Sequence, residues 1–289
     1  MLKIFTDTDT DLTLEEAKKY GFKMISMPYI VGDTEVKPYM DFENFDYKTF
    51  YGMLRNGTLP TTSAISTEEY IKYFEPEFAS GNDILYVHFS RAMTVTFNNM
   101  DKAIEILKVK YPDRKFYEVD TLGITINSLI IVKAIGDMYL EGKTAEEITK
   151  WAEKEVSHYA TYFFADDLKF FKRSGRVSNL AAIMGGMIGL KPIICMGEDG
   201  KMTNISKAIG RNNAINKLVS YVTELGLDVE KHRVIVGHAD SLDLAKELAN
   251  KLQEVYDNKL NIEFAVVNPT AGSHCGPDTV GVSFHAIRR

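Results

Sequence analysis

The sequence predicts an α/β protein of two domains, the first built on a parallel sheet and the second on a mixed sheet. In the first half of the chain, short apolar runs alternate with stretches whose apolar residues recur at helical spacing. Strands that alternate with helices form right-handed crossovers and a parallel sheet. In the second half, two apolar runs flank turn residues at 197–200, which is typical of an antiparallel hairpin. We expect an N-terminal domain over residues 1–158 and a C-terminal domain over residues 159–289.

The first half carries clear helix signals. Residues 97–111 place Met100, Ile104 and Leu107 on one face, as an amphipathic helix requires. Three predicted helices begin with a hydroxyl residue followed three positions later by Glu, the pattern of a capping box. The pairs are Thr13 with Glu16, Ser66 with Glu69, and Thr144 with Glu147. The predicted strands cover 2–6, 24–31, 84–89 and 115–119, and the predicted helices cover 13–20, 67–74, 97–111, 127–141 and 144–158.

The remaining segments are less regular. Residues 32–60 show little periodicity and are expected to pass over the surface. In the second half, a buried strand at 161–165 precedes a basic loop at 172–176 and an apolar segment at 180–190. The other predicted elements of this half are strands at 191–196, 201–208, 262–267 and 280–284 and a helix at 241–256.

The composition indicates a protein with a large core in a reducing compartment. Hydrophobic residues make up 45% of the 289 residues, and 34 Lys and Arg against 40 Asp and Glu give a net charge of −6. That balance does not favour nucleic acid as a partner. The two cysteines, Cys195 and Cys275, fit a reducing environment better than a disulfide scaffold. We expect no signal peptide. We also expect no stable membrane insertion, because segment 180–190 is shorter than the roughly 20 residues that span a bilayer. The protein is expected to be soluble and cytoplasmic.

Several apolar runs end in segments rich in hydroxyl groups. These segments lie at 6–8, 61–63, 90–94 and 120–121. In an open α/β sheet, ligands bind beyond the carboxyl ends of the strands, where the N-termini of helices also point. Hydroxyl and free backbone N–H groups at such a place can hold an anion without any titratable nucleophile. The pattern therefore predicts a protein that binds an anionic ligand rather than attacks it.

The acidic start of the chain offers an alternative from the enzyme class. Residues 9–14 fit the D-x-D-x-T pattern of haloacid-dehalogenase-like phosphatases, in which the first Asp is the nucleophile and the second the acid/base beside Mg²⁺. Asp9 and Asp11 would take these roles, and the pair 166–167 could supply the later acidic residues. The first apolar run, however, ends at Phe5, too early to place Asp9 at a strand end. In the plainer interpretation, Asp11 helps to cap the first helix.

His274 is the histidine best placed for an anionic ligand. It lies in the Gly-containing segment 272–279, predicted as a loop, where it is either a turn residue or a charged donor to the ligand. Cys275 beside it suggests a Cys/His nucleophile, but adjacent residues of an extended loop tend to point in opposite directions. The basic loop at 172–176 is either a solvated face or a surface for an acidic partner or a phosphate group.

These loops together resemble the DegV family, the bacterial fatty-acid-binding proteins, over nearly the whole chain. The family has a Thr-Ser-Gln-Pro-Ser run at 62–66, a Leu-Ser-Gly-Thr-Tyr run near 90–97 and a His-Thr-Gly-Pro-Gly run at 274–278. Segment 168–177 resembles the family's Leu-x-x-Leu-x-x-Gly-Gly-Arg-Ile run and keeps Arg176. Further similarities lie at 6–12, 120–121 and 191–193.

The resemblance implies one long-chain fatty acid in a buried tunnel between two α/β domains, with the last loop and strand returning to the ligand. Its carboxylate would be held by Thr62, Thr94 and His274, with Ser63 beside them. The protein would need no cofactor and have no catalysis of its own. It would present the ligand to a separate kinase subunit that makes an acyl phosphate, and Arg176 is the expected contact with that partner.

The tail of such a ligand needs an apolar wall. Burial of an acyl chain contributes ~0.8 kcal/mol per methylene, so the head-group site mainly has to orient the ligand. Segment 180–190, with the adaptable side chains of Met184 and Met187, is a candidate for this wall. Two departures from the family bear on the head group: Val95 replaces a glycine, so the backbone there should avoid positive φ, and Asp278 replaces another glycine and adds a negative charge.

Overall fold

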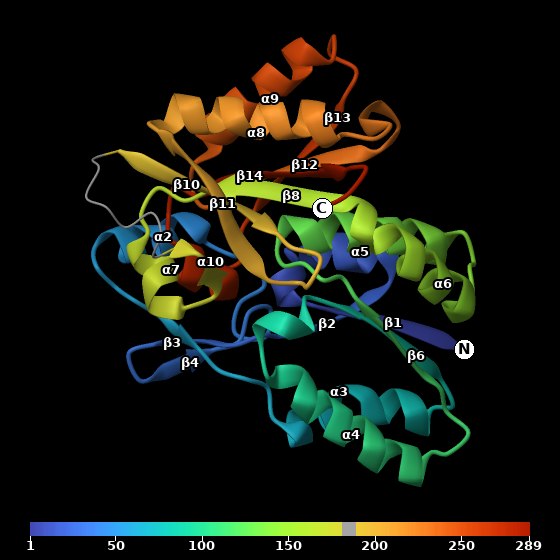
Figure 1. Ribbon diagram of the computed structural model, residues 1–289. Coiled ribbons are helices and arrows are strands. Elements are labelled where there is room, and N and C mark those ends of the chain that lie inside the picture. Colours follow the sequence, from blue (N-terminus) through green and yellow to red (C-terminus); the bar gives the residue numbers. More distant parts are fainter. Residues whose placement is uncertain (181–188) are drawn as a thin grey trace.

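The computed structural model describes residues 1–180 and 189–289, and these residues form three sheets (Figure 1). The first sheet has four parallel strands in the order β2-β1-β6-β7. Because only crossovers can join parallel strands, each connection runs through helices. The strands are β1 (Leu2–Asp7), β2 (Phe22–Ile25), β6 (Asp83–His88) and β7 (Phe116–Asp120).

Helices cover both faces of this sheet, as successive residues of β1 show. Phe5 packs with Phe74 and Met100 of α3 and α4, whereas Ile4 packs with Leu129 of α5 on the opposite face. This alternation follows from the two-residue period of a strand. The helices concerned are α1 (Leu14–Tyr20), α3 (Thr67–Ala79), α4 (Thr96–Lys110), α5 (Ile126–Leu140) and α6 (Ala145–Glu155).

The second sheet is mixed, with the order β13-β12-β14-β8-β10-β11-β9 in the described part of the chain. Helices α8 (Arg211–Leu225) and α9 (Leu242–Val255) cover one face. Helix α5 packs against the other, so it lies between the two large sheets (Figure 1) and is apolar nearly all round. The strands are β8 (Tyr159–Phe164), β9 (Val177–Ser178), β10 (Leu190–Met196), β11 (Met202–Ile209), β12 (Arg233–His238), β13 (Asn261–Val266) and β14 (Val280–His285).

A third, small sheet lies beside α2 (Tyr47–Arg55), α7 (Lys169–Ser174) and α10 (Pro269–Cys275) (Figure 1). The prediction that 32–60 merely passes over the surface was wrong, because α2 buries Phe50 and Leu54 in the core. Helix α10 brings a C-terminal segment into contact with this N-terminal sheet. The strands of the small sheet are β3 (Tyr29–Val31), β4 (Thr34–Val36) and β5 (Thr61–Thr62).

The structure confirms the α/β class and most elements predicted in the first half. Both capping boxes at Thr13 and Thr144 are complete. At Ser66, the hydroxyl accepts a hydrogen bond from the amide N of Glu69 at 3.2 Å, but the Glu69 carboxylate pairs with Lys37 at 2.5 Å instead of turning back. The predicted strand at 24–31 is divided into β2 and β3.

The second half confirms the hairpin of β10 and β11 and corrects two loops. Residues 172–174 belong to helix α7, which ends at Gly175 in the left-handed conformation. Residues 272–275, predicted as loop, form the end of α10. Met184 and Met187, predicted to line the tail site, lie outside the described residues. The domain boundary at 158 falls directly before β8 and stays a prediction. Across the described ranges, no helix is both long and apolar enough to cross a membrane.

Candidate functional site: a cavity with a polar end and an apolar end

One small cavity brings together the hydroxyl residues and the histidine singled out from the sequence. Thr62 lies on β5, Thr94 follows the short helix η2 (Arg91–Met93), and His274 lies in the last turn of α10. All three line this cavity, and so do Ser63 and Arg176. The structure therefore places every predicted head-group residue at one site, although their contact with a ligand stays a prediction.

Helix α10 is held in place by its N-terminus. The side chain of Asn268 caps the helix by accepting a hydrogen bond from the amide N of Ala271 at 2.9 Å, and Pro269 takes the first helical position, where no N–H is needed. Asp11 fixes Asn268 in turn, because its Oδ1 accepts hydrogen bonds from the backbone N (2.9 Å) and Nδ2 (2.7 Å) of Asn268. Asp11 thus positions the helix that carries His274.

His274 forms a hydrogen bond with Thr62, with 3.1 Å between Nε2 and Oγ1. Burial, together with the positive charges of Arg176 and Arg173, lowers the pKa of His274 to about 4. The ring is therefore neutral near pH 7, which argues against the interpretation of His274 as a charged donor. A neutral imidazole still offers one donor and one acceptor.

Arg176 supplies positive charge beside these neutral groups. Its side chain lines the head-group cavity and the apolar cavity next to it. Nη1 donates to the backbone O of Ser174, which ties the guanidinium to its own loop. Charged donors form stronger hydrogen bonds to carboxylates than neutral ones do. Arg176 can therefore face a ligand, and its predicted role in contacting a partner protein stays a prediction.

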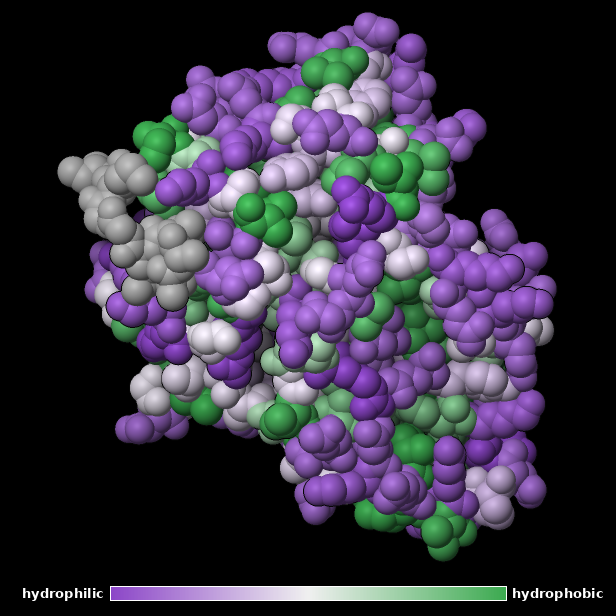
Figure 2. Space-filling model, in the orientation of Figure 1, coloured by the Kyte–Doolittle hydropathy of each residue, from purple (hydrophilic) through white to green (hydrophobic). Residues whose placement is uncertain are grey.

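An apolar cavity of about 60 Å³ adjoins the polar end. The two cavities share Met93, Ile124, Arg176 and His274 in their walls, so they are direct neighbours. Figure 2 shows hydrophobic residues scattered among hydrophilic ones on the outer face in view. The apolar lining of the cavity comes from Ile126, Phe163, Phe171, Met196, Met202, Val267 and Ala271.

Two glycines in this wall allow neighbouring side chains to approach the backbone closely. A Cβ atom at Gly281 would lie 2.6 Å from Cβ of Phe163, and one at Gly237 would lie 2.4 Å from Cγ2 of Ile126. Real Cβ atoms do not approach so closely, so side chains here would push Phe163 or Ile126 out of place. Both glycines lie in central strands, where glycine usually marks the close approach of another group.

The phosphohydrolase alternative is not supported. Asp7, rather than Asp9, ends the first strand, and Asp11 is occupied by Asn268. In residues 1–180 and 189–289, no group of three or more His, Cys, Asp or Glu side chains is placed to hold a metal ion. The second acidic pair is also engaged elsewhere, because Asp166 pairs with Lys191 at 2.6 Å and with Arg211 at 2.9 Å.

A Cys/His nucleophile is not formed either. Cys275 is buried, and burial raises the pKa of its thiol to about 12, so the reactive thiolate is suppressed. Its Sγ lies 3.4 Å from the backbone O of Gly276. Cys275 acts as a small, largely apolar residue in the wall of the apolar cavity.

The two glycine replacements do not disturb the head group. Val95 has φ −95° and ψ −1°, which confirms the expectation that its backbone avoids positive φ. Asp278 has φ +60°, a conformation that Asp tolerates better than most residues. Its carboxylate pairs with Arg55 at 2.9 Å and accepts a hydrogen bond from Ser241 at 3.0 Å. Its charge is therefore balanced away from the cavity.

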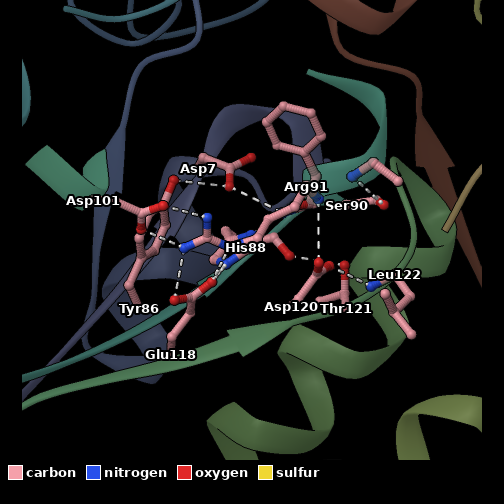
Figure 3. Close-up of polar contacts among 12 residues, drawn as sticks. Asp7, Tyr86, His88, Ser90, Arg91, Asp101, Glu118, Asp120, Thr121 and Leu122 are labelled. Atoms are coloured by element: carbon pink, nitrogen blue, oxygen red, sulfur yellow. Dashed lines mark hydrogen bonds and ion pairs between the residues drawn. The ribbon is translucent and has the colours of Figure 1, made fainter. Parts of the chain in front are cut away.

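A network of charges that sequence reasoning missed fixes the turn before Thr94. Figure 3 shows Arg91 between two acidic side chains: it pairs with Asp101 at 2.8 Å and also with Glu118, which His88 reaches at 2.8 Å. The backbone N of Arg91 donates to Asp120 at 3.2 Å. The sequence marks Asp120 as the end of a strand. It does not show the ion pairs of Arg91, because Asp101 and Glu118 lie 10 and 27 residues away from it in the chain.

We predict that Glu118→Gln lowers stability and loosens this turn. Burial alone would raise the pKa of Glu118, but hydrogen bonds from His88 and Arg91 outweigh it and hold the pKa at about 2 instead of 4.5. The carboxylate therefore stabilises the fold by about 3 kcal/mol above pH 4.5, and this contribution is lost as the pH falls toward 2. Urea unfolding at pH 7 and pH 3 measures it. The variant should differ from the wild type at pH 7 and approach it at pH 3, and equal differences at both pH values would contradict the assignment.

The comparison with known proteins agrees with this architecture. A family model described as "Uncharacterised protein, DegV family" matches residues 1–286. A DegV domain-containing protein of Clostridium perfringens is 31% identical over 281 residues, which cover 97% of this chain and 96% of the relative.

Solved structures of low sequence identity share the fold. A stearic-acid-binding protein from Eubacterium ventriosum has a TM-score of 0.86 at 20% identity, covering 99% of this chain and 98% of that one. A DegV family protein from Eubacterium eligens loaded with heptadecanoic acid has a TM-score of 0.84 at 17% identity, covering 99% and 100%. With the family model spanning nearly every residue and a relative at 31% identity, the chain belongs to the DegV family.

Proposed function

We propose that the protein binds one long-chain fatty acid, with the carboxylate at the polar end of the cavity and the acyl chain in its apolar part. The observation that carries this proposal is that a polar cavity and an apolar cavity lie side by side and share His274 and Arg176 in their walls. An amphipathic ligand with a single acidic head matches this arrangement. The two solved structures described with stearic and heptadecanoic acid support the same class of ligand.

The energetics of this arrangement suit a binding protein. The acyl chain of a sixteen-carbon acid would gain on the order of 10 kcal/mol from burial at ~0.8 kcal/mol per methylene. The carboxylate loses its hydration when it enters the site, and this loss must be offset by hydrogen bonds or charge. Thr62, Thr94 and the neutral ring of His274 would donate hydrogen bonds, and Arg176 would balance the charge. The lining thus supports a ligand that is held and not transformed.

A kinase partner is the finer part of the proposal. The site would present its carboxylate to a separate fatty acid kinase subunit, which would form the acyl phosphate in phospholipid metabolism. We place that contact at Arg176, which lines the cavity, and at the exposed Lys172 and Arg173 near it in the sequence, because positive charge steers an acidic or phosphate-bearing partner. The free thiols of Cys195 and Cys275 support a cytoplasmic location.

Native mass spectrometry of the purified protein tests the proposal. We expect a mass increase that matches one C14–C18 fatty acid, and loss of that increase after delipidation. The delipidated protein should regain the mass when incubated with hexadecanoic acid but not with butyric acid, whose short chain buries too few methylenes. A protein that carries no fatty acid and takes up none after delipidation would overturn the function.

A further inference from the structure

Asp9 is an unexpected member of the head-group cavity. It lies in the short helix η1 (Thr8–Thr10) between β1 and α1. The residue is only 5% exposed, yet it lines the same cavity as Thr62, Thr94 and His274. A second carboxyl group thus lies in the wall of a site proposed for a carboxylate.

The carboxyl group of Asp9 lacks the partners that its neighbours have. Asp7 accepts hydrogen bonds from Tyr86 at 3.1 Å and from the amide N of Phe89 at 3.2 Å, and Asp11 accepts two from Asn268. The Oδ1 atom of Asp9 is buried without a hydrogen-bond partner among the described residues. Native structures rarely leave a buried polar atom unpaired, so Asp9 has a hydrogen-bonding capacity that no group in the described part of the chain meets.

The surroundings of Asp9 favour its protonated form. Burial raises the pKa of Asp9 well above 3.8, and the carboxyl groups of Asp7 and Asp11 raise it further by repulsion. Helices α10 and α5 pack against η1; α10 contributes His274 and Cys275, and Lys133 of α5 is paired with Glu16 and Glu263. Arg176 lies on the cavity wall. A protonated carboxyl group is a hydrogen-bond donor.

We propose that Asp9 is a head-group residue whose carboxylic acid donates a hydrogen bond to the bound carboxylate, so that the two carboxyl groups share one proton. This inference rests on the proposed function. Two carboxyl groups in one site cannot both ionise without strong repulsion, and a shared proton turns that repulsion into attraction. The site would then bind the ionised form of the fatty acid, and the shared proton would come from Asp9.

Two variants separate donation from packing. Asp9→Asn keeps a neutral donor of the same shape, and Asp9→Leu keeps the branching at Cγ but removes every polar atom. At pH 6 we expect hexadecanoate, measured by displacement of a fluorescent fatty acid from delipidated protein, to bind Asp9→Asn within about threefold of the wild type. Asp9→Leu should bind at least tenfold more weakly while its melting temperature stays equal or higher, because an unpaired buried polar group has been removed. Equal affinity of Asp9→Leu and the wild type would overturn the proposal.

The dependence of affinity on pH provides a second arm. Once the empty wild type loses the Asp9 proton, each further pH unit should lower its affinity up to tenfold, whereas Asp9→Asn cannot lose a proton there. We expect the affinity ratio of Asp9→Asn to wild type to rise as the pH increases, and to rise likewise when both carry Asp7→Asn, which removes a nearby titrating group. A constant ratio would overturn the shared proton. Absence of hexadecanoate binding to the wild type at every pH would instead overturn the proposed function itself.

Discussion

Replacement of His274 by Ala should lower the affinity for a long-chain fatty acid by roughly 10- to 100-fold, which corresponds to about 1.5–3 kcal/mol for a hydrogen bond to a charged group. The ring forms a hydrogen bond with Thr62 and lines both the polar and the apolar cavity. Loss of the ring would remove a hydrogen-bond donor to the ligand carboxylate and leave a void beside it. Calorimetric titration of the delipidated protein with hexadecanoate measures the change.

Matched variants assign this loss to the hydrogen bond. His274→Gln keeps an amide donor and acceptor and should recover part of the affinity, whereas Thr62→Val keeps the shape of Thr62 and removes only its hydroxyl. Because the two side chains contact each other, the double replacement should cost less than the sum of the single ones. Thr223→Ala on the exposed face of α8 serves as the control. Unchanged affinity in His274→Ala would place the head group at the other end of the cavity.

The polar end of the site could be predicted because its signals are local. Thr62 and Thr94 lie where strands and turns end, and hydroxyl residues at such positions are visible in the sequence. His274 was found through the resemblance of its segment to a family motif. Its helix was not predicted, although Asn268 before Pro269 is the start of a capped helix, as the structure shows.

The apolar end could not be predicted in the same way. Phe163, Met196 and Met202 come from three strands of the mixed sheet, and which face of each strand meets the cavity depends on how α5, α7 and α10 pack around it. Asp9 shows the same limit. The sequence motif suggested the nucleophile of a phosphatase, whereas the tertiary structure buries Asp9 in the cavity wall. Burial decides its chemistry, and burial is not visible in a run of residues.

Two neighbouring aspartates should respond to the same replacement to different extents. Burial raises the pKa of both Asp7 and Asp11 from 3.8 to about 7. The unfolded chain therefore releases these protons near pH 4 and the folded protein only near pH 7, so stability falls as the pH rises between these values. Each aspartate destabilises the fold by about 4 kcal/mol above pH 7.

Asp11→Asn should raise stability at pH 8, because Oδ1 of Asn accepts both hydrogen bonds from Asn268 and the charge is gone. The new amide N of the Asp11→Asn side chain would take the place of Oδ2, which is buried without a partner in the described structure. An unpaired buried amide costs about 1–3 kcal/mol, so the net increase in stability would be smaller by that amount. Asp7→Asn should be less stable than Asp11→Asn at every pH, since Oδ1 and Oδ2 of Asp7 both accept from backbone N–H groups, those of Asp9 and Phe89, and an amide N cannot. Urea unfolding from pH 5 to pH 8 measures both. A wild type whose stability rose with pH, together with two variants of equal stability, would mean that the buried aspartates are charged in the folded protein. The surroundings of Asp9 would then not favour its protonated form, on which its proposed role as a donor depends.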